Sequence, residues 1–277
     1  MKNPIKKVIA VHDLSGMGRC SLSVIIPTLS VMGIQVCPLP TAILSTQTDG
    51  FSDFTFRDLT GDLVPYFEHL LALDTDFQAF YSGFLGNAKQ IEKVEYMIDK
   101  LPSSTLVLVD PVMGDDGEFY STYDHTMKDG MKELIKKAGV ITPNVTEAAF
   151  LLDCEPKSTY TKEEICQMIK NLANITSAKI VITGIEGDGS VNCAYSEDGG
   201  KTIGFTSNKR VGKRYPGTGD VFASVLLGRL LQGKSFALSV EKASAFVGEV
   251  MAYSTNFLYP EREGVLIENN LSKLLDE

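Results

Sequence analysis

The sequence lacks several features that would define its chemistry at once. Its five cysteines are odd in number and contain no Cys-x-x-Cys pair, so they indicate neither a disulfide framework nor a zinc site. The three histidines, His12, His69 and His125, are too scattered to form a local metal motif. No G-x-x-x-x-G-K-[ST] segment is present, so any bound nucleotide is not held by a P-loop.

Basic charge and long apolar runs are also scarce. The net charge of -9 argues against a nucleic-acid or anionic-membrane partner, because either would need a basic face. Nucleotides are not excluded, since backbone amides and a metal ion can bind them. No apolar run approaches the length of a membrane span, and the strand after residues 1–7 is too short for the core of a signal peptide. We therefore expect a cytoplasmic protein.

What remains is the composition of an ordinary globular chain. Its 277 residues are 44% hydrophobic and 22% charged, enough to bury a full core. No repeat, linker or low-complexity block divides the chain, so we expect a single domain over residues 1–277. Predicted strands and helices alternate throughout, which favours a three-layer α/β/α sandwich on a mostly parallel central sheet.

Apolar runs and their spacing locate these elements. Strands are expected at residues 8–11, 34–39, 41–44, 77–81, 105–109, 139–141, 179–182, 191–195 and 202–206, the last two as an antiparallel pair. Helices are expected at residues 20–32, 59–73, 88–101, 161–173, 221–231 and 237–252, with a short surface helix from residue 268.

A glycine-rich turn, Gly217-Thr218-Gly219-Asp220, opens one of these helices. Its two glycines permit a tight backbone path whose amides point to one place, and a helix N-terminus attracts anions. We therefore expect a phosphate here. Asp220 would compete with that phosphate unless it has a task such as accepting a proton. The alternative is that Asp220 is only an N-cap or first-turn acid.

Acids also follow the most strand-like run, residues 105–109. Asp110 and Asp115 lie in Asp-Pro-Val-Met-Gly-Asp, at the carboxyl end of a predicted central strand, where open α/β sheets bind ligands. Magnesium prefers few carboxylates, with waters or phosphate oxygens as its other ligands. Asp110 and Asp115 would supply the carboxylates. They would otherwise be turn-forming acids in a surface loop. Residues 117–123, which follow, have the composition of a flexible flap.

Three further segments are candidates for phosphate or metal binding. Asn144 and Glu147 have the spacing of a capping box, and would otherwise join a metal–phosphate assembly. Thr183 and Gly184 end a strand, where a hydroxyl and free amides can face a nucleotide phosphate. The basic cluster Lys209–Arg214 would attract polyphosphate or would form a solvated loop.

The first loop, residues 12–18, follows the strand at 8–11. Gly16 and Gly18 suggest a dinucleotide fingerprint, but Ser21 occupies the third glycine position. No acid follows a second strand about 20 residues on, so a Rossmann dehydrogenase is not favoured. A small-molecule loop at the end of a strand is the better interpretation. The hydroxyl-rich residues 45–50 would line a polar pocket or form a solvated turn.

Taken together, three motifs resemble the ribokinase-like superfamily. They are Gly217-Thr218-Gly219-Asp220, Asp110-Pro111-Val112-Met113-Gly114 and Thr142-Pro143-Asn144-x-x-Glu147. Their order and separations are similar to those of its vitamin-kinase branch, the pyridoxal/pyridoxamine kinases and the hydroxymethylpyrimidine (phosphate) kinases. The resemblance spans nearly the whole chain.

The resemblance implies that ATP phosphorylates a primary hydroxymethyl group, with Asp220 as the general base. The amides of the three preceding residues, Gly217, Thr218 and Gly219, would form an anion hole. Mg²⁺ would be organised, directly or through water, by Asp110, Asp115 and Glu147. The nucleotide would contact Thr142, Asn144, Thr183 and Gly184. A homodimer and a monovalent cation such as K⁺ are also common in that family.

The substrate follows from the same resemblance. The segment around Phe84 and the flap at Tyr120 look like the pyridoxal kinase group, which implies a B6 vitamer phosphorylated at its 5'-hydroxymethyl group. That group commonly has Ser-x-x-x-x-Tyr-Gly in its first loop and Gly-Tyr-Leu-Gly in the middle segment. This chain departs from both patterns, with Asp13 in place of the serine, Met17 in place of the first tyrosine and Phe84 in place of the second.

The Asp13 loop is instead similar to the Asp-Pro-Ser-Gly-Gly loop of hydroxymethylpyrimidine kinases. A carboxylate there would accept a hydrogen bond from a ring hydroxyl, a protonated pyridine or an exocyclic amine. The substrate-binding candidates are Asp13, Thr41, Ser45, Thr46 and Phe84. A B6 vitamer is favoured. The alternatives are a hydroxymethylpyrimidine (phosphate) kinase of thiamine synthesis, a catalytically silent vitamer- or nucleotide-binding regulator, and a sugar or nucleoside kinase.

Overall fold

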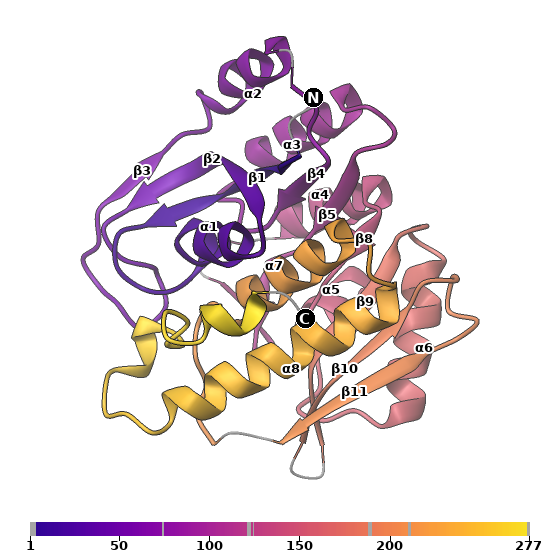
Figure 1. Cartoon of the computed structure of the whole chain (residues 1–277). Helices are drawn as coiled ribbons and strands as arrows, with labels where there is room; N and C mark the ends of the chain where they lie inside the picture. The colour runs from indigo at the N-terminus through magenta and orange to yellow at the C-terminus, as the bar shows by residue number, and fades with distance from the viewer. Residues whose placement is uncertain are drawn as a thin grey trace.

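The computed structural model describes residues 4–73, 75–120, 123, 125–187, 190–209 and 212–275. A nine-stranded sheet runs through its middle in the order β11-β10-β9-β8-β5-β4-β1-β2-β3 (Figure 1). The strands from β9 to β2 in that order are parallel, and the antiparallel strands lie at the two edges. The predicted mostly parallel sheet is confirmed.

The strands of the main sheet are β1 (Lys6–Ser15), β2 (Ile34–Leu44), β3 (Phe56–Asp58), β4 (Ala79–Ser82), β5 (Leu106–Val109), β8 (Val140–Ile141), β9 (Lys179–Gly187), β10 (Ser190–Ser196) and β11 (Gly204–Lys209). A separate small hairpin is made of β6 (Gly114–Asp115) and β7 (Glu118–Phe119).

Helices cover both faces of the sheet. One layer contains α1 (Ser21–Val31), α7 (Thr218–Leu231) and α8 (Phe236–Ser254), which lie in front of the sheet in Figure 1. The other layer contains α2 (Leu63–Ala72), α3 (Ala88–Lys100), α4 (His125–Leu134), α5 (Val145–Leu151) and α6 (Lys162–Ala173). The expected three-layer α/β/α sandwich is therefore confirmed.

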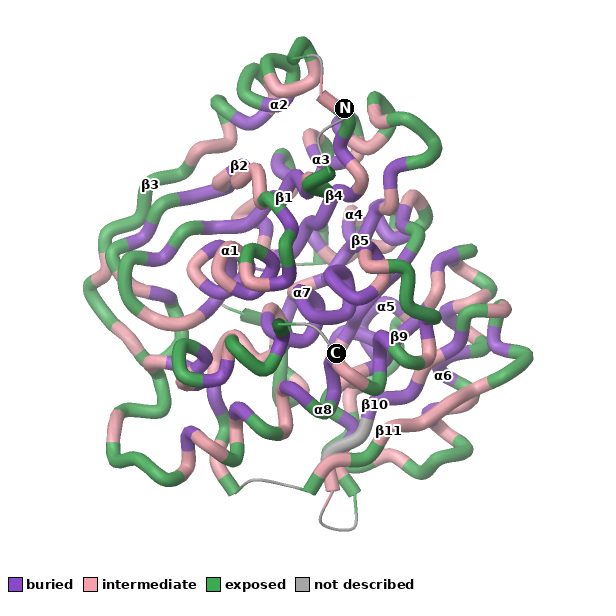
Figure 2. Tube along the Cα trace, in the orientation of Figure 1, coloured by how far each residue is buried: buried purple, intermediate pink, exposed green. Residues whose placement is uncertain are grey.

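Successive side chains along each strand face opposite sides of the sheet, which creates two separate cores. In β1, Val8 and Ala10 pack with the α1, α7 and α8 layer, whereas Ile9 and Val11 pack with the other layer. All four residues are fully buried, which explains why this parallel strand is one unbroken apolar run in the sequence. Figure 2 shows that the central part of the molecule is largely buried. Side chains on the Val8 and Ala10 face of β1 therefore face the layer of α1, α7 and α8.

The predicted break between residues 39 and 41 was wrong, because β2 is one strand through Pro38 and Pro40. It pairs with β1 along its length, whereas β3 covers only Ala42–Leu44 on its other side. The prolines therefore lie beside an open edge, where a strand tolerates a residue that cannot donate to a ladder.

Several other boundaries differ from the predictions. Strand β1 continues to Ser15 and β9 to Gly187, so the first residues of the loops predicted after residues 11 and 182 belong to strands. The helix expected at 59–73 begins only at Leu63, because residues 59–62 form a turn in which Thr60 N donates to Asp58 Oδ1 at 2.8 Å. The tail ends in a 3₁₀ turn, Leu271–Leu274, and Leu274 is buried against the α1, α7 and α8 layer, so it is not a surface helix. Within the ranges described, no helix has the length and apolar character that crossing a bilayer requires.

Candidate active site

The predicted site residues gather where the parallel strands end and α7 begins. Val109 of β5 is in register with Ile141 of β8, so the residues that follow them are neighbours. Thr142 accordingly donates its hydroxyl hydrogen bond to Asp110 Oδ1 at 3.0 Å. The backbone N–H of Asp110 donates to Ser82 O at the end of β4, at 2.8 Å. Asp110 is thus held at the carboxyl edge of the sheet, as predicted for a ligand-binding acid.

Asp110 is a buried acid with no basic partner among the described ion pairs. Burial, and to a smaller extent the charge of Asp220, raises the pKa of Asp110 to about 8, while the Thr142 hydroxyl opposes both effects. A Cβ built on Gly219 would lie 3.9 Å from Asp110 Oδ2. The first turn of α7 therefore passes close to this carboxyl group.

Asp220 lies in that first turn but does not cap its own helix. Its Oδ2 accepts a hydrogen bond from Ser21 N at 2.8 Å, and no side chain caps α7. Burial raises the pKa of Asp220 to about 7, with a smaller contribution from the charge of Asp13, while the Ser21 N–H lowers it. The side chain stays 13% exposed. A reachable carboxyl group that titrates near neutrality is suited to general-base chemistry.

The turn before Asp220 can be built only with glycine. Gly217 has φ +78°, and a Cβ there would lie 1.9 Å from Arg19 O. The first N–H groups of α7, which include those of Thr218 and Gly219, have no partner inside the helix by geometry, and no side chain caps them. The helix start can therefore serve as an anion hole.

Asn144 and Glu147 form the capping box of α5 and also fix the loop after β5. Glu147 N donates to Asn144 Oδ1 at 2.9 Å, and Asn144 N donates to Glu147 Oε2 at 2.8 Å. The other Glu147 oxygen accepts from Met113 N at 3.1 Å, and Asn144 Nδ2 donates to Gly114 O at 2.8 Å. Burial raises the pKa of Glu147, and the charge of Asp110 adds to the effect. The cap and a role near the metal are therefore compatible.

Asp115 lies on the exposed β6–β7 hairpin, and its Oδ1 accepts from Asp116 N at 2.9 Å. In the described part of the chain, no three His, Cys, Asp or Glu side chains lie close enough to hold a metal by themselves. This donor set fits Mg²⁺ held by Asp110 together with waters and phosphate oxygens, since that ion keeps much of its hydration. The buried, unpaired Asp110 carboxyl is the feature that such an ion would neutralise.

Two members of the basic cluster pair with acids. Lys213 Nζ lies 3.4 Å from Glu261, while Arg214 pairs with Asp116 of the hairpin and, at 3.2 Å, with Glu186. Arg210 lies outside the described residues. The predicted attraction for polyphosphate stays a prediction.

The nucleotide candidates Thr183 and Gly184 lie beside Asn144. Thr183 forms an isolated parallel bridge with Asn144, and its N–H donates to Pro143 O at 2.9 Å. Gly184 is exposed, with φ +70°. Both residues lie inside β9, which continues to Gly187, so the predicted turn directly after residue 182 was wrong. Residues 188–189 lie outside the described residues.

On the substrate side, Asp13 is buried at the end of β1 and accepts from Ser15 Oγ at 3.0 Å. Burial raises the pKa of Asp13. Backbone hydrogen bonds join its loop to residues 44–47, for example Met17 N to Ser45 O at 3.1 Å. These two segments are therefore held side by side.

The other substrate candidates are already engaged locally. Thr41 Oγ1 donates to Phe84 O at 3.4 Å, Ser45 Oγ accepts from Thr55 N at 2.9 Å, and Thr46 Oγ1 donates to Gln47 O at 3.1 Å. The Phe84 ring is half-buried, with its centroid 6.2 Å from that of Tyr123. Flap residues 121 and 122 lie outside the described residues.

Two residues at the site were not assigned from the sequence. Ser21 supplies the N–H bound to Asp220, and His12 Nδ1 lies 3.8 Å from Asp220 Oδ1. The signal available for His12 was a polar residue directly after the apolar run of β1. Ser21 gave no signal, because a backbone donor does not depend on residue type.

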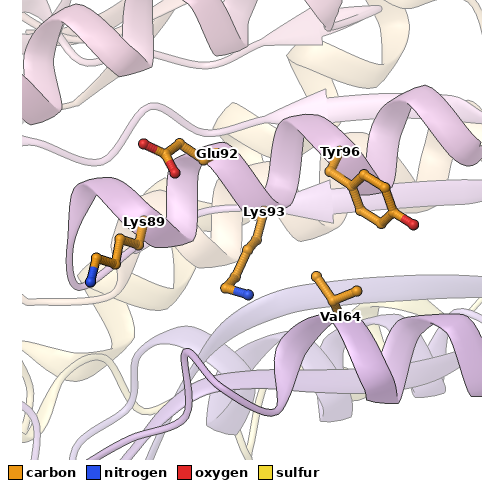
Figure 3. Close-up of a pocket in the computed structure, with 5 residues that line it drawn as sticks. All are labelled: Val64, Lys89, Glu92, Lys93 and Tyr96. Carbon is orange, nitrogen blue, oxygen red and sulfur yellow. The ribbon is translucent and has the colours of Figure 1, made fainter.

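A surface groove of about 330 Å³ lies elsewhere, between α2 and α3. Lys93 and Tyr96 extend from α3 toward Val64 on α2 (Figure 3). None of the predicted site residues lines it, so the groove is not the active site.

A mostly parallel sheet between two helical layers, with an acid on a glycine-opened helix beside a buried aspartate, defines a small-molecule kinase of the ribokinase-like class. The model of the phosphomethylpyrimidine kinase family matches residues 26–262. The chain belongs to this family.

Individual relatives agree with the assignment. A candidate phosphomethylpyrimidine kinase from Bacteroides thetaiotaomicron is 38% identical, with a TM-score of 0.94 over 99% of this chain and 95% of its own. A second crystal form of that protein contains pyridoxal. A pyridoxine/pyridoxal/pyridoxamine kinase of Bordetella avium is 26% identical, covering 92% of this chain and 90% of its own. A hydroxymethylpyrimidine/phosphomethylpyrimidine kinase of Aquifex aeolicus is 28% identical over 68% of this chain and 72% of its own.

Proposed function

We propose that the protein transfers the γ-phosphoryl group of ATP to the 5'-hydroxymethyl group of a B6 vitamer. The observation that carries this proposal is the position of Asp220. Its carboxyl group is bound from another helix, while the N–H groups at the start of its own helix stay open beside buried Asp110. A base and an anion hole on one helical turn are what phosphoryl transfer to an alcohol needs.

In this mechanism Asp220 accepts the hydroxyl proton as the phosphoryl group arrives. Proton acceptance is late and concerted, because an alcohol is far too weak an acid to ionise unaided. The amides of Gly217, Thr218 and Gly219 stabilise the charge on the phosphoryl oxygens. Asp110 would hold Mg²⁺, with Glu147 and Asp115 contributing through water, and the ion neutralises phosphate charge when bound. Thr142, Asn144, Thr183 and Gly184 would line the nucleotide side.

The choice of a B6 vitamer rests on relatives and on Asp13. The Bacteroides relative holds pyridoxal in one crystal form, and the Bordetella relative is named for three B6 vitamers. A buried carboxyl group at position 13 suits a pyridine nitrogen or a ring hydroxyl. The same acid favours the second candidate, hydroxymethylpyrimidine (phosphate) kinase, because those enzymes resemble this chain in the Asp13 loop and the Aquifex relative carries that name.

Several further properties belong to this proposal. The chain would act as one kinase domain over residues 1–277, as a cytoplasmic homodimer. A monovalent cation such as K⁺ would be a further cofactor. These statements rest on the composition and on the resemblance to the family.

The decisive experiment measures ADP release with Mg-ATP across pyridoxal, pyridoxamine, pyridoxine, hydroxymethylpyrimidine and ribose. We expect the highest kcat/KM for a B6 vitamer. A preference for hydroxymethylpyrimidine would move the assignment to the second candidate, and a preference for ribose would overturn the branch assignment. A lack of turnover with every substrate would favour the catalytically silent regulator.

A further inference from the structure

His12 is a polar side chain buried in the interior of the protein. It follows the buried run of β1, its side chain is 0% exposed, and neither ring nitrogen has a hydrogen-bond partner. Burial lowers the pKa of His12 to about 3, so the ring is neutral at physiological pH. A neutral imidazole carries one N–H donor and one acceptor, and leaving both unpaired inside a protein is costly.

The position of the ring is fixed by its neighbours on β4 and directly after it. Tyr81 meets it edge-on, with ring centroids 4.3 Å apart. Gly83 leaves room for it, because a Cβ there would lie 2.1 Å from His12 Cε1. The register between β1 and β2 shifts just after His12, a type of irregularity that re-aims side chains next to active sites. The imidazole is therefore held in one orientation.

In that orientation the His12 ring faces Asp220, the proposed base. Ring atom Nδ1 lies 3.8 Å from Oδ1 of Asp220, the oxygen that Ser21 does not occupy. Ser21 itself has the left-handed backbone conformation, with φ +47°, and its N–H donates to Oδ2. The two carboxylate oxygens thus face two different protein groups.

We propose that His12 is a positioning residue for Asp220, with the hydrogen on Nδ1 directed at Oδ1 of the carboxylate. The inference rests on the proposed function, in which Asp220 is the base. A shift of less than about 1 Å would bring the pair into hydrogen-bond range. The imidazole then fixes the rotation of the carboxylate and favours its ionised form, while Ser21 holds the other oxygen. His12 has no exposed surface and does not exchange the substrate proton.

The kinetic test compares His12→Leu with His12→Asn, because Asn offers a donor close to the Nδ1 position and Leu offers none. We expect kcat to fall about 10–100-fold in the leucine variant, the range of a hydrogen bond to a charged group. The KM values for ATP and vitamer should stay within about threefold, since ground-state binding does not use His12. His12→Asn should recover most of the lost kcat.

The matched control is Thr28→Val. The Thr28 hydroxyl is also fully buried without a partner, but it lies on α1 away from Asp220. This variant should keep wild-type kcat. Wild-type kcat in His12→Leu, or equal loss in folded Leu and Asn variants, would overturn the proposal.

A second measurement does not depend on activity or on a variant of His12. The other two histidines are exposed, so a His69→Gln, His125→Gln protein leaves one imidazole for ¹⁵N NMR. We expect the Nδ1–H tautomer at neutral pH, and an Nε2–H tautomer would overturn the inference. If this protein shows the expected tautomer but no vitamer is phosphorylated, the proposed function fails and the geometric pairing stands.

Discussion

The backbone N–H of Ser21 donates a hydrogen bond of 2.8 Å to Oδ2 of Asp220, a residue 199 positions later in the chain. The bond joins the start of α1 to the start of α7. It draws the Asp220 carboxyl group away from the N–H groups of its own helix, which have no side-chain cap. A proton acceptor and an anion site can therefore occupy one helical turn without neutralising each other.

Asp220→Asn should lower kcat by about 10²–10⁴-fold, because the amide cannot accept the hydroxyl proton. The amide oxygen can still accept from Ser21 N, so the fold and ATP affinity should change little. Initial rates of ADP release and calorimetric ATP titration measure the two effects. Glu249→Gln, which alters an exposed acid on α8, is the control, and its kcat and ATP affinity should equal those of the wild type. Unchanged turnover in Asp220→Asn would remove this residue from the mechanism.

Ser21→Gly and Ser21→Val should differ sharply, although both remove the hydroxyl group. Glycine accepts φ +47° without strain, so we expect near-native stability and kcat. A β-branched side chain at this backbone conformation should cost about 1–3 kcal/mol in the free energy of unfolding and displace the N–H from Asp220. Urea denaturation and kcat measure both effects. Equal behaviour of the two variants would mean that the backbone conformation is not what matters.

The sequence predicted the parts of the site that are local in the chain. The glycine turn before Asp220, the acid after β5 and the capping box at Asn144 each depend on residue types at fixed spacing. Ser21 and His12 could not be assigned in this way, because their roles arise only when β1, α1 and α7 pack together. A backbone donor leaves no mark in residue type.

The errors in the fold have a similar origin. Pro38 and Pro40 predicted a break in β2, and only the pairing of neighbouring strands shows that both lie beside an open edge. The helix α4 was not predicted, although Met127, Met131 and Leu134 form its buried face. Its apolar residues are few, and the segment before it has turn-like composition.

Gly217→Ala should be severely destabilising, because the new Cβ would meet Arg19 O at 1.9 Å in a residue with φ +78°. We expect a loss of about 2–4 kcal/mol in unfolding free energy and a rise in KM for ATP. Gly212→Ala is the matched control, since a Cβ there meets nothing within 4 Å. Thermal melts and ATP kinetics measure both effects. Equal behaviour of the two variants would contradict the need for glycine at position 217.

Asp110→Asn should stabilise the metal-free protein, and more so at high pH. The folded-state pKa of Asp110 is raised to about 8, so its contribution to stability is complete below the unfolded value of 3.8 and is lost as pH rises through 8. The variant has no such loss. In EDTA, its advantage in unfolding free energy should grow by about 2–5 kcal/mol between pH 5 and pH 9. With Mg-ATP the wild type should become more stable than the variant, because an uncharged amide at this position cannot neutralise the ion. A pH-independent difference would contradict the burial of an unpaired carboxyl group.

Asp13 offers the sharpest separation of the two candidate substrates. Its carboxyl group is buried at the end of β1, and the pyridoxal kinases that this chain resembles commonly have serine there. Asp13→Ser should therefore keep turnover of a B6 vitamer, with KM changed by about tenfold or less, since a hydroxyl can still bond a ring group. The KM for ATP should not change, because Asp13 lies on the substrate side. Parallel assays with pyridoxal and hydroxymethylpyrimidine measure the difference. A hydroxymethylpyrimidine kinase would instead lose its reaction in this variant, because the carboxylate would no longer accept from the exocyclic amine of the pyrimidine.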